Sequence, residues 1–552
     1  MLRLVSTTVG PASIAVGANG PTQVVEAYNA GDGTLSLTVS SSVAWAVATV
    51  GKAGPCTTTN QVAVPCIPIS VALNTASLAA GMQTGILTVT GDATTVDAPQ
   101  TISVTVAMGG AVPSGISVYV PPNGSVNVPT PTNSDLRWTA TTQDANNWLS
   151  MTISGNGSFR FVYPWNVHIA AQPANTPGIY TGTMNLSGSS FAGDNKSVQV
   201  VMNVTTLPIA QQPAPVSVRL AQGAPPLAAP YTAVPVTLVN TGQGTLTVTS
   251  VGETSAGFCP GSWLTVAQTS TGAVLTVDPT GLQIGTCTAT LSIASNAVNS
   301  PTQVPVSLQV VAKGPPLIQY QGVVDNASFT PGGPVSPGDI ALVKGEQFSF
   351  AGASDGGYTA GPAPPLATDL GGASVTVNGT PAPLFYSFYG QLAFQVPMGT
   401  AVGTAVVQVA RDDGSVGNLA SVPVAARAPG ILVVTKADYS VPGASNPAHV
   451  GDALLIWSIG MGATSPAAVT GQPAPSSPFA TLIDTPTVSF GTGEALVPPA
   501  TATPFFAGLA PPYAGLYQIN VTVPVGCPTG TVFVTVGFAD GTYSNTVQIT
   551  VE

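Results

Sequence analysis

The chain carries few residues that could do chemistry, and its histidines restrict it most. Only His168 and His449 are present, and they are far apart in the sequence. A Ser-His-Asp triad, a Cys-His pair or a His-rich metal site would have to be built around one of them. His168 lies in the alternating run Trp165–Ile169, which predicts a strand, and His449 precedes a turn at Gly451-Asp452. We expect both to be structural or solvent-facing, and we predict no catalytic residues and no enzyme.

Carboxylates are scarce as well, with twenty-two in the whole chain. Glycosidases need two of them across a cleft, and no such pair stands out. Asp412-Asp413-Gly414 is typical of a hairpin turn; the alternative is a calcium site, although the usual ligand spacing is missing. Asp339 and Asp452 each follow a glycine near a strand start, where capping of a turn is expected. No glycine-rich loop ends in the Lys-Ser/Thr of a phosphate site. We therefore predict no metal and no cofactor.

The five cysteines indicate an oxidising compartment. Cys56 and Cys66 flank a short loop, and Cys259 and Cys287 lie in corresponding halves of a later repeat. Both pairs suit disulfides, and buried free thiols are the alternative. Cys527 has no partner nearby, so we expect it to be free or to pair with another chain.

Aromatic residues are the remaining candidates for ligand contact. One tryptophan recurs in each of the first three repeats, at Trp45, Trp148 and Trp263. Such a residue is either a core anchor, which we favour, or a platform on which a sugar stacks. For the platform the best candidates are Trp148, Trp165 and Tyr389. Two further clusters, Phe385–Tyr389 and Pro511–Tyr517, are interpreted as packing between the last two modules, with an exposed ligand patch as the alternative.

Composition excludes several classes of protein. Hydrophobic residues make up 44% of the 552 residues and charged residues only 6%, with a net charge of -11. Disordered chains are usually poor in Val and Ile and rich in charge, so this chain should fold. Eleven Lys and Arg, without a basic cluster, exclude a nucleic-acid surface and disfavour an anionic membrane surface. No apolar run reaches transmembrane length. The first residues lack the apolar run of a secretory signal, so we expect that a signal was removed or precedes this numbering.

Internal repeats predict a string of small β-sandwiches. Asn29–Val39 matches Asn240–Val248, and both begin with an Asn-x-Gly-x-Gly turn whose glycines supply positive φ. Near the end, Gly390-Gln-Leu-Ala-Phe-Gln-Val-Pro397 repeats as Tyr517-Gln-Ile-Asn-Val-Thr-Val-Pro524. Alternating strands separated by turns are typical of sandwiches.

These patterns predict an all-β fold of tandem immunoglobulin-like β-sandwich domains in an elongated array. Pro/Gly-rich joints divide the chain into five domains: 1–108, 109–206, 207–313, 314–428 and 429–552.

From about Ile318 onward, the chain resembles an uncharacterised family of C-terminal domains in large secreted proteins of acidobacteria. The resemblance is carried by fixed points that include Gly322–Phe329, Gly371–Gly379, Asn446–Ala448 and Gly515–Val521. The sequence departs from the family at Gln391-Leu392-Ala393, where the family has Gln-Ile-Asn. The earlier modules resemble BACON-type and related bacterial immunoglobulin-like domains, of which BACON domains were proposed to bind carbohydrate. The resemblances imply the fold and secretion more than a function.

These observations predict a secreted or cell-surface, non-catalytic structural or adhesive protein. Its strands carry few charged residues that would protect sheet edges, which suggests that edges are covered by other modules or other copies. We therefore hypothesise a self-assembling subunit of an extracellular filament or layer, with homo-oligomers or other surface proteins as partners. The alternative is a carbohydrate-binding surface protein whose exposed aromatics contact a polysaccharide.

Overall fold

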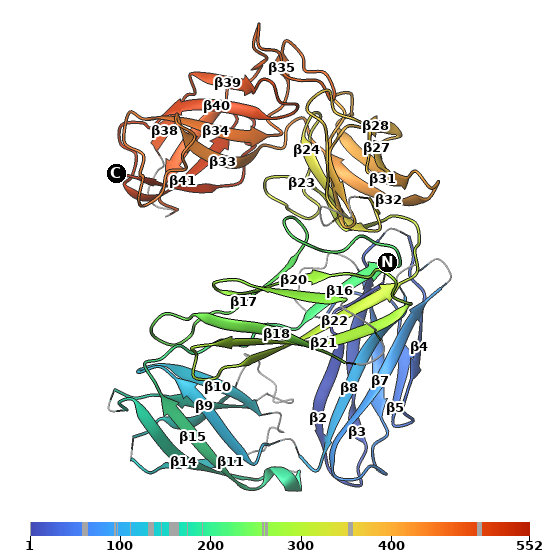
Figure 1. Cartoon of the computed structure of the whole chain (residues 1–552), viewed down its shortest axis with the longest axis vertical. Coiled ribbons are helices and arrows are strands. Elements are labelled where there is room, and N and C mark those ends of the chain that lie inside the picture. Colours follow the sequence, from blue (N-terminus) through green and yellow to red (C-terminus); the bar gives the residue numbers. More distant parts are fainter. Residues whose placement is uncertain are drawn as a thin grey trace. The chain divides into compact units, whose positions relative to one another are not determined.

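The structure is a computed structural model of the chain (Figure 1). It describes residues 2–31, 33–57, 65–92, 95, 98–110, 112–130, 137–144, 146–153, 165–173, 175–189, 191–256, 259, 263–351, 357–493 and 500–552. These residues form β-strands and a single short 3-10 helix, η1 (Ala192–Asp194). The predicted all-β fold of tandem sandwiches is confirmed. The strands form ten sheets, two in each of the five predicted ranges.

The chain divides into two compact units. One contains Met1–Arg219, Ala233–Val277 and Gly285–Gln309. The other, which we call the C-terminal unit, contains Leu220–Thr232, Asp278–Ile284 and Val310–Glu552. The elongated arrangement and the domain boundaries stay predictions.

The first sandwich packs a sheet in the order β1-β3-β6-β5 on a sheet in the order β2-β8-β7-β4. Val and Leu side chains at every second position face the core, as in β7, where Leu87 and Val89 are fully buried. The strands are β1 (Leu2–Leu4), β2 (Thr8–Ile14), β3 (Gly20–Asn29), β4 (Leu37–Ser41), β5 (Ala46–Val50), β6 (Cys66–Leu73), β7 (Gly81–Gly91) and β8 (Gln100–Met108).

The second sandwich packs β10-β13-β12 on β11-β14-β15-β9. Trp148, Met184 and Met202 fill the space between the two sheets. The strands are β9 (Gly115–Val120), β10 (Ser125–Thr130), β11 (Arg137–Thr142), β12 (Leu149–Ile153), β13 (Trp165–Ala170), β14 (Gly178–Ser187) and β15 (Ser197–Val204).

The third sandwich packs β16-β22-β21-β18 on β17-β20-β19. Its last strand, β22, alternates strictly, with Val304, Val306 and Leu308 buried. The strands are β16 (Val216–Ala221), β17 (Val234–Thr237), β18 (Val248–Ala256), β19 (Leu264–Gln268), β20 (Gly272–Val277), β21 (Gly285–Ser295) and β22 (Thr302–Val311).

The fourth sandwich packs β23-β24-β30-β29-β25 on β26-β27-β31-β32, with β28 added to β27. The strands are β23 (Leu317–Asp325), β24 (Ile340–Glu346), β25 (Thr359–Ala360), β26 (Asp369–Leu370), β27 (Ala373–Val377), β28 (Thr380–Ala382), β29 (Leu384–Phe388), β30 (Gln391–Gln395), β31 (Gly403–Arg411) and β32 (Val416–Val424).

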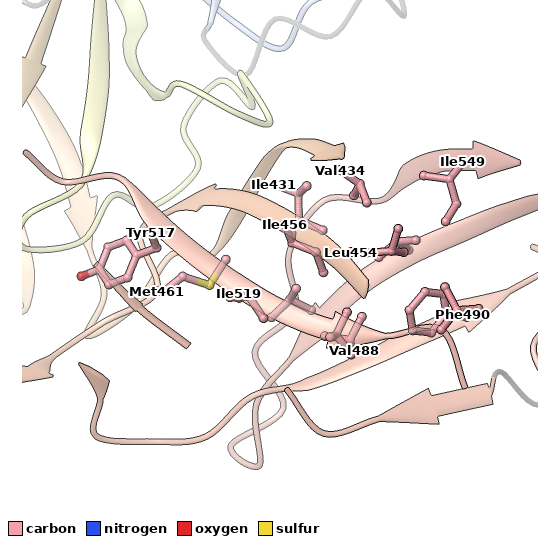
Figure 2. Close-up of a cluster of buried hydrophobic side chains, with 14 of the residues drawn as sticks. Ile431, Val434, Leu454, Ile456, Met461, Val488, Phe490, Tyr517, Ile519 and Ile549 are labelled. Carbon is pink, nitrogen blue, oxygen red and sulfur yellow. The ribbon is translucent and has the colours of Figure 1, made fainter. Parts of the chain in front are cut away.

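The fifth sandwich packs the six-stranded sheet β33-β34-β40-β39-β36-β35 on β38-β37-β41-β42. Figure 2 shows its core, where Ile456 of β34 and Ile519 of β40 lie near Val488 and Phe490 of the second sheet. The strands are β33 (Gly430–Lys436), β34 (Ala453–Ile459), β35 (Thr464–Ser465), β36 (Thr481–Leu482), β37 (Thr487–Gly491), β38 (Ala500–Ala502), β39 (Phe506–Leu509), β40 (Tyr517–Thr522), β41 (Gly530–Gly537) and β42 (Val547–Val551).

The predicted Asn-x-Gly-x-Gly turns are confirmed. Asn29 accepts a hydrogen bond from the backbone N–H of Gly31 (3.1 Å) and donates to the carbonyl of Gly33 (3.0 Å), and Asn240 does the same at Gly242 and Gly244. Gly33 and Gly244 have φ of 83° and 70°. A residue with a Cβ rarely adopts this conformation, which explains why glycine recurs there.

A backbone segment at the start of each sandwich is held by a side chain at or near the start of its last strand. Asn299 accepts from the N–H of Ala210 (2.9 Å) and donates to its carbonyl (2.8 Å). The same two-point contact joins Asn418 to Ile318 and Asn545 to Ile431.

The first two sandwiches make the contact with other residue types. In the second, Asp194 accepts from the N–H of Val112 (3.0 Å) and Lys196 donates to the carbonyl of Val112. In the first, Gln100 donates to the carbonyl of Leu2 (2.7 Å). We call these five the anchor contacts: Leu2–Gln100, Val112–Asp194/Lys196, Ala210–Asn299, Ile318–Asn418 and Ile431–Asn545.

Early and last strands also pair in parallel where their register is known. β2 pairs with β8, and β9 pairs with β15 from Gly115↔Gln199 to Val120↔Val204. In the last two sandwiches, parallel bridges join Val335 to Val424 and Ala448 to Val551. In these four sandwiches an early segment and the last strand therefore run side by side in the same direction, over several residues in the first two and at a single bridge in each of the last two.

Candidate binding face on the last sandwich

Two of the three predicted sugar platforms, Trp148 and Tyr389, are buried. Trp148 is 1% exposed, and its Nε1 donates to Asp144 Oδ1 (3.0 Å), which makes it a core anchor. Tyr389 is 5% exposed, and its hydroxyl accepts a hydrogen bond from the backbone N–H of Ala221 (2.8 Å). The backbone of Trp165 begins β13, but its side chain lies outside the described residues.

The aromatic cluster at Phe385–Tyr389 contacts rings from other segments of its unit. Tyr386 and Phe388 stack on each other (5.6 Å between centroids), and both lie tilted against Tyr358, which stacks on Tyr231 at 4.0 Å. These rings lie on β29, beside the short edge strand β25, and packing against the last module stays a prediction. In the other cluster, Tyr517 belongs to the core of the last sandwich.

Both predicted disulfides are present. Cys56 pairs with Cys66 across a sequence separation of 10, and Cys259 pairs with Cys287 across a separation of 28. Cys527 is a free thiol in the core of the last sandwich, where burial raises its pKa.

The polar candidates are engaged in structural contacts. His168 Nδ1 lies 2.8 Å from Asn127 Oδ1 on the neighbouring strand β10. The backbone N–H of His449 donates to Asp452 Oδ2 (2.9 Å), so Asp452 caps the turn as predicted. At the predicted hairpin turn, Asp413 forms ion pairs with Arg411 and Lys313. Hydrogen bonds from Ser415 and Lys313 hold the pKa of Asp413 well below its usual range. Within the described residues, no group of three or more His, Cys, Asp or Glu side chains is placed to hold a metal.

Asp325, Asp339 and Glu346 are buried in the described part of the C-terminal unit, and Asp339 is the most deeply buried of them. Asp339 is fully buried, and its Oδ2 accepts from the N–H of Ser336 (3.2 Å). Burial, together with the charge of Asp325, raises the pKa of Asp339 well above its ordinary value. The carboxylate faces Gly460, where an added Cβ would lie 3.1 Å from Asp339 Oδ2. It is therefore a structural group between the fourth and fifth sandwiches of this unit.

The last sandwich presents a different kind of surface on the outer face of its six-stranded sheet. Strand alternation buries Leu454 and Ile456 of β34 and turns Leu455 and Trp457 to the other side. On β40 the same alternation buries Ile519 and turns Gln518 and Asn520 outward. The register pairs Trp457 with Gln518 and Leu455 with Asn520, so the four outward side chains form two adjacent rows.

A ring stack lies at one side of these rows. Tyr439, from the turn after β33, stacks on Trp457 with 6.1 Å between centroids and 25° between planes. Tyr439 is 69% exposed, and Trp457 is partly exposed. The indole Nε1 donates to Thr435 Oγ1 (3.1 Å), which fixes the orientation of the ring.

On the other side of Trp457, amides and further rings continue the surface. Gln518 Nε2 donates to Asn520 Oδ1 (2.8 Å), which leaves other donor and acceptor positions of both amides open to a ligand. Phe506 lies beside Asn520 in the register and packs edge-on against Phe479 at 5.8 Å. We call the set Tyr439, Trp457, Gln518, Asn520, Phe506 and Phe479 the aromatic-amide face.

The fourth sandwich contains the matching sheet, and the part of its outer face around Leu342 and Ala393 is closed. By register, Ala393 takes the place of Asn520, Leu342 that of Leu455 and Lys344 that of Trp457. Val324, Leu342 and Ala393 form a buried apolar cluster with 1–2% exposure. The fold of this sheet therefore does not require an open aromatic and amide surface.

A pocket of about 290 Å³ also lies in the C-terminal unit, beside Tyr513. Its walls are mostly Pro, Ala and Val from the segment 466–475. Gln395 at its edge is already hydrogen-bonded, accepting from the N–H of Gly471 (2.6 Å) and donating to the carbonyl of Gly338 (3.3 Å). The pocket therefore offers shape and apolar contact but few polar groups to orient a ligand.

Sequence reasoning missed Trp457, Tyr439, Gln518 and Asn520 as a set. The signal was present in part, because the repeated strand Tyr517–Pro524 alternates and places Gln518 and Asn520 on one face. Trp457 was not singled out, and nothing in the sequence placed Tyr439 against it.

Comparisons with known proteins give no family. No protein-family model and no curated protein matches the chain, so the resemblances described above stay predictions. Among solved structures, the chain is similar to a Bacteroides ovatus mixed-linkage glucan utilization locus protein, SGBP-B, in complex with a mixed-linkage heptasaccharide, with 14% identity over 62% of this chain and 67% of that one and a TM-score of 0.21.

Two others are the extracellular cadherin domains 1–5 of protocadherin gamma B2 (11% identity, 98% and 99% coverage, TM-score 0.15) and Drosophila N-cadherin EC1-3 (8% identity, 56% and 100% coverage, TM-score 0.19). Likeness at this level carries no argument about function. In the described part of the chain, no helix has the length and apolar character needed to cross a membrane.

Proposed function

We propose that this is a secreted or cell-surface, non-catalytic structural protein that carries tension in an adhesive or scaffolding role. The observation that supports the proposal most is the set of five anchor contacts. In each sandwich a backbone segment at the start is joined by side-chain hydrogen bonds to the beginning of the last strand.

The geometry of these contacts suits a chain pulled from its two ends. Force enters a sandwich at its first segment and leaves at the far end of its last strand. Where an early segment and the last strand pair in parallel, the hydrogen bonds between them are loaded together in shear, whereas an antiparallel hairpin pulled at its open end breaks one pair at a time. Resistance to force is governed by the unfolding rate, so contacts that must break together are the ones that matter.

Other features support an extracellular setting. The two disulfides require an oxidising compartment to persist. One of them, Cys259–Cys287, lies inside the third sandwich, where it limits how far the chain can extend even after unfolding. The polar side chains that might serve chemistry are, as described above, engaged in turns, ion pairs and anchor contacts.

Single-molecule force spectroscopy of the full chain, held at its ends, tests the proposal. We expect one unfolding event per sandwich. Asn418→Ala should lower the unfolding force of the fourth sandwich, and Asn545→Ala should lower that of the fifth. Thr535→Val is the control, because it removes a surface hydrogen bond to Thr546 in the same sandwich without touching the anchor contact. Unchanged forces in both asparagine variants would exclude the tension-bearing role.

Self-assembly into a filament or layer is a separate part of the proposal. Light scattering or electron microscopy of concentrated full-length protein tests it. We expect polymers. A protein that stays strictly monomeric at high concentration would contradict self-assembly, whereas the mechanical role would still be decided by the force measurement.

A further inference from the structure

We propose that the aromatic-amide face binds a neutral polysaccharide. The sugar rings would pack on Trp457 and Tyr439, and the hydroxyls would exchange hydrogen bonds with Gln518 and Asn520. This goes beyond the mechanical role and does not depend on it.

A sugar has apolar ring faces and polar hydroxyls, and the aromatic-amide face offers a contact for each. A pyranose offers C–H groups on its ring faces, which pack on an aromatic π face, and hydroxyls at its rim that both donate and accept. Amide side chains are neutral and can likewise both donate and accept hydrogen bonds. Rows spaced by about 5 Å across the sheet bring rings and amides within reach of one sugar chain.

The conformation of Tyr439 indicates that its position is maintained by its surroundings. Its φ is +65°, in the left-handed region that residues with a Cβ rarely adopt. Asp438 accepts from the N–H and hydroxyl of Ser440, and Asn446 donates to that hydroxyl (2.8 Å). Lys436 donates to Asn446 and to the carbonyl of Pro447. This network holds an exposed ring against Trp457 at a backbone cost.

The charge of the face determines which class of polymer it can bind. None of the six residues of the face is charged, and the nearest charged side chains of the turn, Lys436 and Asp438, are engaged in the network just described. Anionic polysaccharides and nucleic acids need cationic side chains to neutralise them. A neutral polysaccharide needs none, so it is the occupant to which we commit.

The duplicated sheet supplies an internal comparison. At the position of Trp457 it has Lys344, whose Nζ lies 5.1 Å from the ring centre of Phe329, and at the position of Asn520 it has the buried Ala393. The same strand order is thus compatible with a buried apolar cluster at the centre of this face. The open rings and amides of the last sandwich are additions that folding does not require.

Pull-down of the full chain on insoluble cellulose, xylan and starch, followed by calorimetric titration with soluble oligosaccharides of the one retained, tests the proposal. We expect binding to at least one neutral glycan and weaker or no binding to polygalacturonate. Trp457→Ala and Tyr439→Ala should each weaken binding by tenfold or more, and Gln518→Ala by several-fold. Trp457→Phe should retain part of the affinity because it keeps a ring.

Tyr513→Ala is the matched control, since Tyr513 is also an exposed tyrosine of this sandwich but lines the pocket instead. If Trp457→Ala does not fold, Tyr439→Ala decides, because Tyr439 lies on an exposed turn outside the core. Failure to bind any of the neutral glycans, or equal binding by Tyr439→Ala, would overturn the proposal. A loss confined to Tyr513→Ala would also overturn it and place the site in the pocket. None of these outcomes alters the force measurement.

Discussion

Asn520 and Ala393 occupy the same position in two copies of one strand, each opposite a leucine of the neighbouring strand. Asn520 is partly exposed and hydrogen-bonded to Gln518, whereas Ala393 is buried against Leu342 and Val324. An amide in the second setting would lose water without gaining a partner. Burial of one face therefore accounts for the departure from the Gln-Ile-Asn pattern in the first copy.

The first prediction concerns this pair. Ala393→Asn should destabilise the fourth sandwich by about 1–3 kcal/mol, because it buries an unpaired amide in an apolar row. Hydrogen exchange of the peptide that contains β30, in the full chain, measures the effect locally. Asn520→Ala is the control and should change stability by no more than about 0.5 kcal/mol. Equal effects of the two substitutions would contradict the explanation by burial.

The second prediction concerns pH. Because burial raises the pKa of Asp339 above its ordinary 3.8, the folded state binds its proton more tightly than the unfolded state does. The resulting stability is fully present below pH 3.8 and is lost as pH rises through the folded pKa. Asp339→Asn cannot ionise at this position. The free energy of unfolding of the variant, minus that of the parent, should therefore be larger at pH 8 than at pH 4. Calorimetry of both proteins across this range measures the difference, and parallel curves would contradict the prediction.

The third prediction concerns the disulfides. By loop-closure entropy, Cys259–Cys287 should contribute about 3.5 kcal/mol and Cys56–Cys66 about 3 kcal/mol. Replacing either pair by serines should lower the melting temperature of one sandwich and leave the other transitions in place. A variant that lacks both disulfides should no longer respond to a reductant. A continued response would show that another thiol, such as Cys527, is involved.

The fourth prediction concerns Arg427, which lies between the fourth and fifth sandwiches of the C-terminal unit. It pairs with Asp484 and Asp540 and stacks on Phe538 at 4.2 Å. Because both carboxylates are largely exposed, the pairs are weak, and Arg427→Ala should cost about 1–2 kcal/mol. Denaturant unfolding at low and high salt measures this. The difference in unfolding free energy between the parent and Arg427→Ala should become smaller at high salt. Arg427→Lys should lose only part of the stability that Arg427→Ala loses. No salt dependence would assign the contribution to the Phe538 stack alone.

Much of the fold could be predicted because it depends on local sequence patterns. Alternation at β22, the glycines of the Asn29 and Asn240 turns, and both cysteine pairs depend on residues close in sequence or on a repeated spacing. The candidate site was harder. Tyr439 meets Trp457 only because the turn after β33 folds back over β34, and alternation cannot reveal such a turn.

Burial from distant segments also escaped prediction. Tyr389 looks like one exposed ring among several, yet the backbone of Ala221 covers its hydroxyl. The anchor contacts were missed for a related reason. Asn299, Asn418 and Asn545 look like ordinary turn residues, and their partners lie roughly a whole domain earlier in the sequence.

The parallel pairing of early and last strands has one more consequence. When these two strands run in the same direction, the polypeptide arrives at one pole of a sandwich and departs from the opposite pole. The gene can then gain a new copy between two existing ones, and the path of the polypeptide through the existing sandwiches does not have to change. Chains of this design can lengthen or shorten by whole units over evolutionary time, and the near-identical turns at Asn29 and Asn240 are what such copying would leave behind.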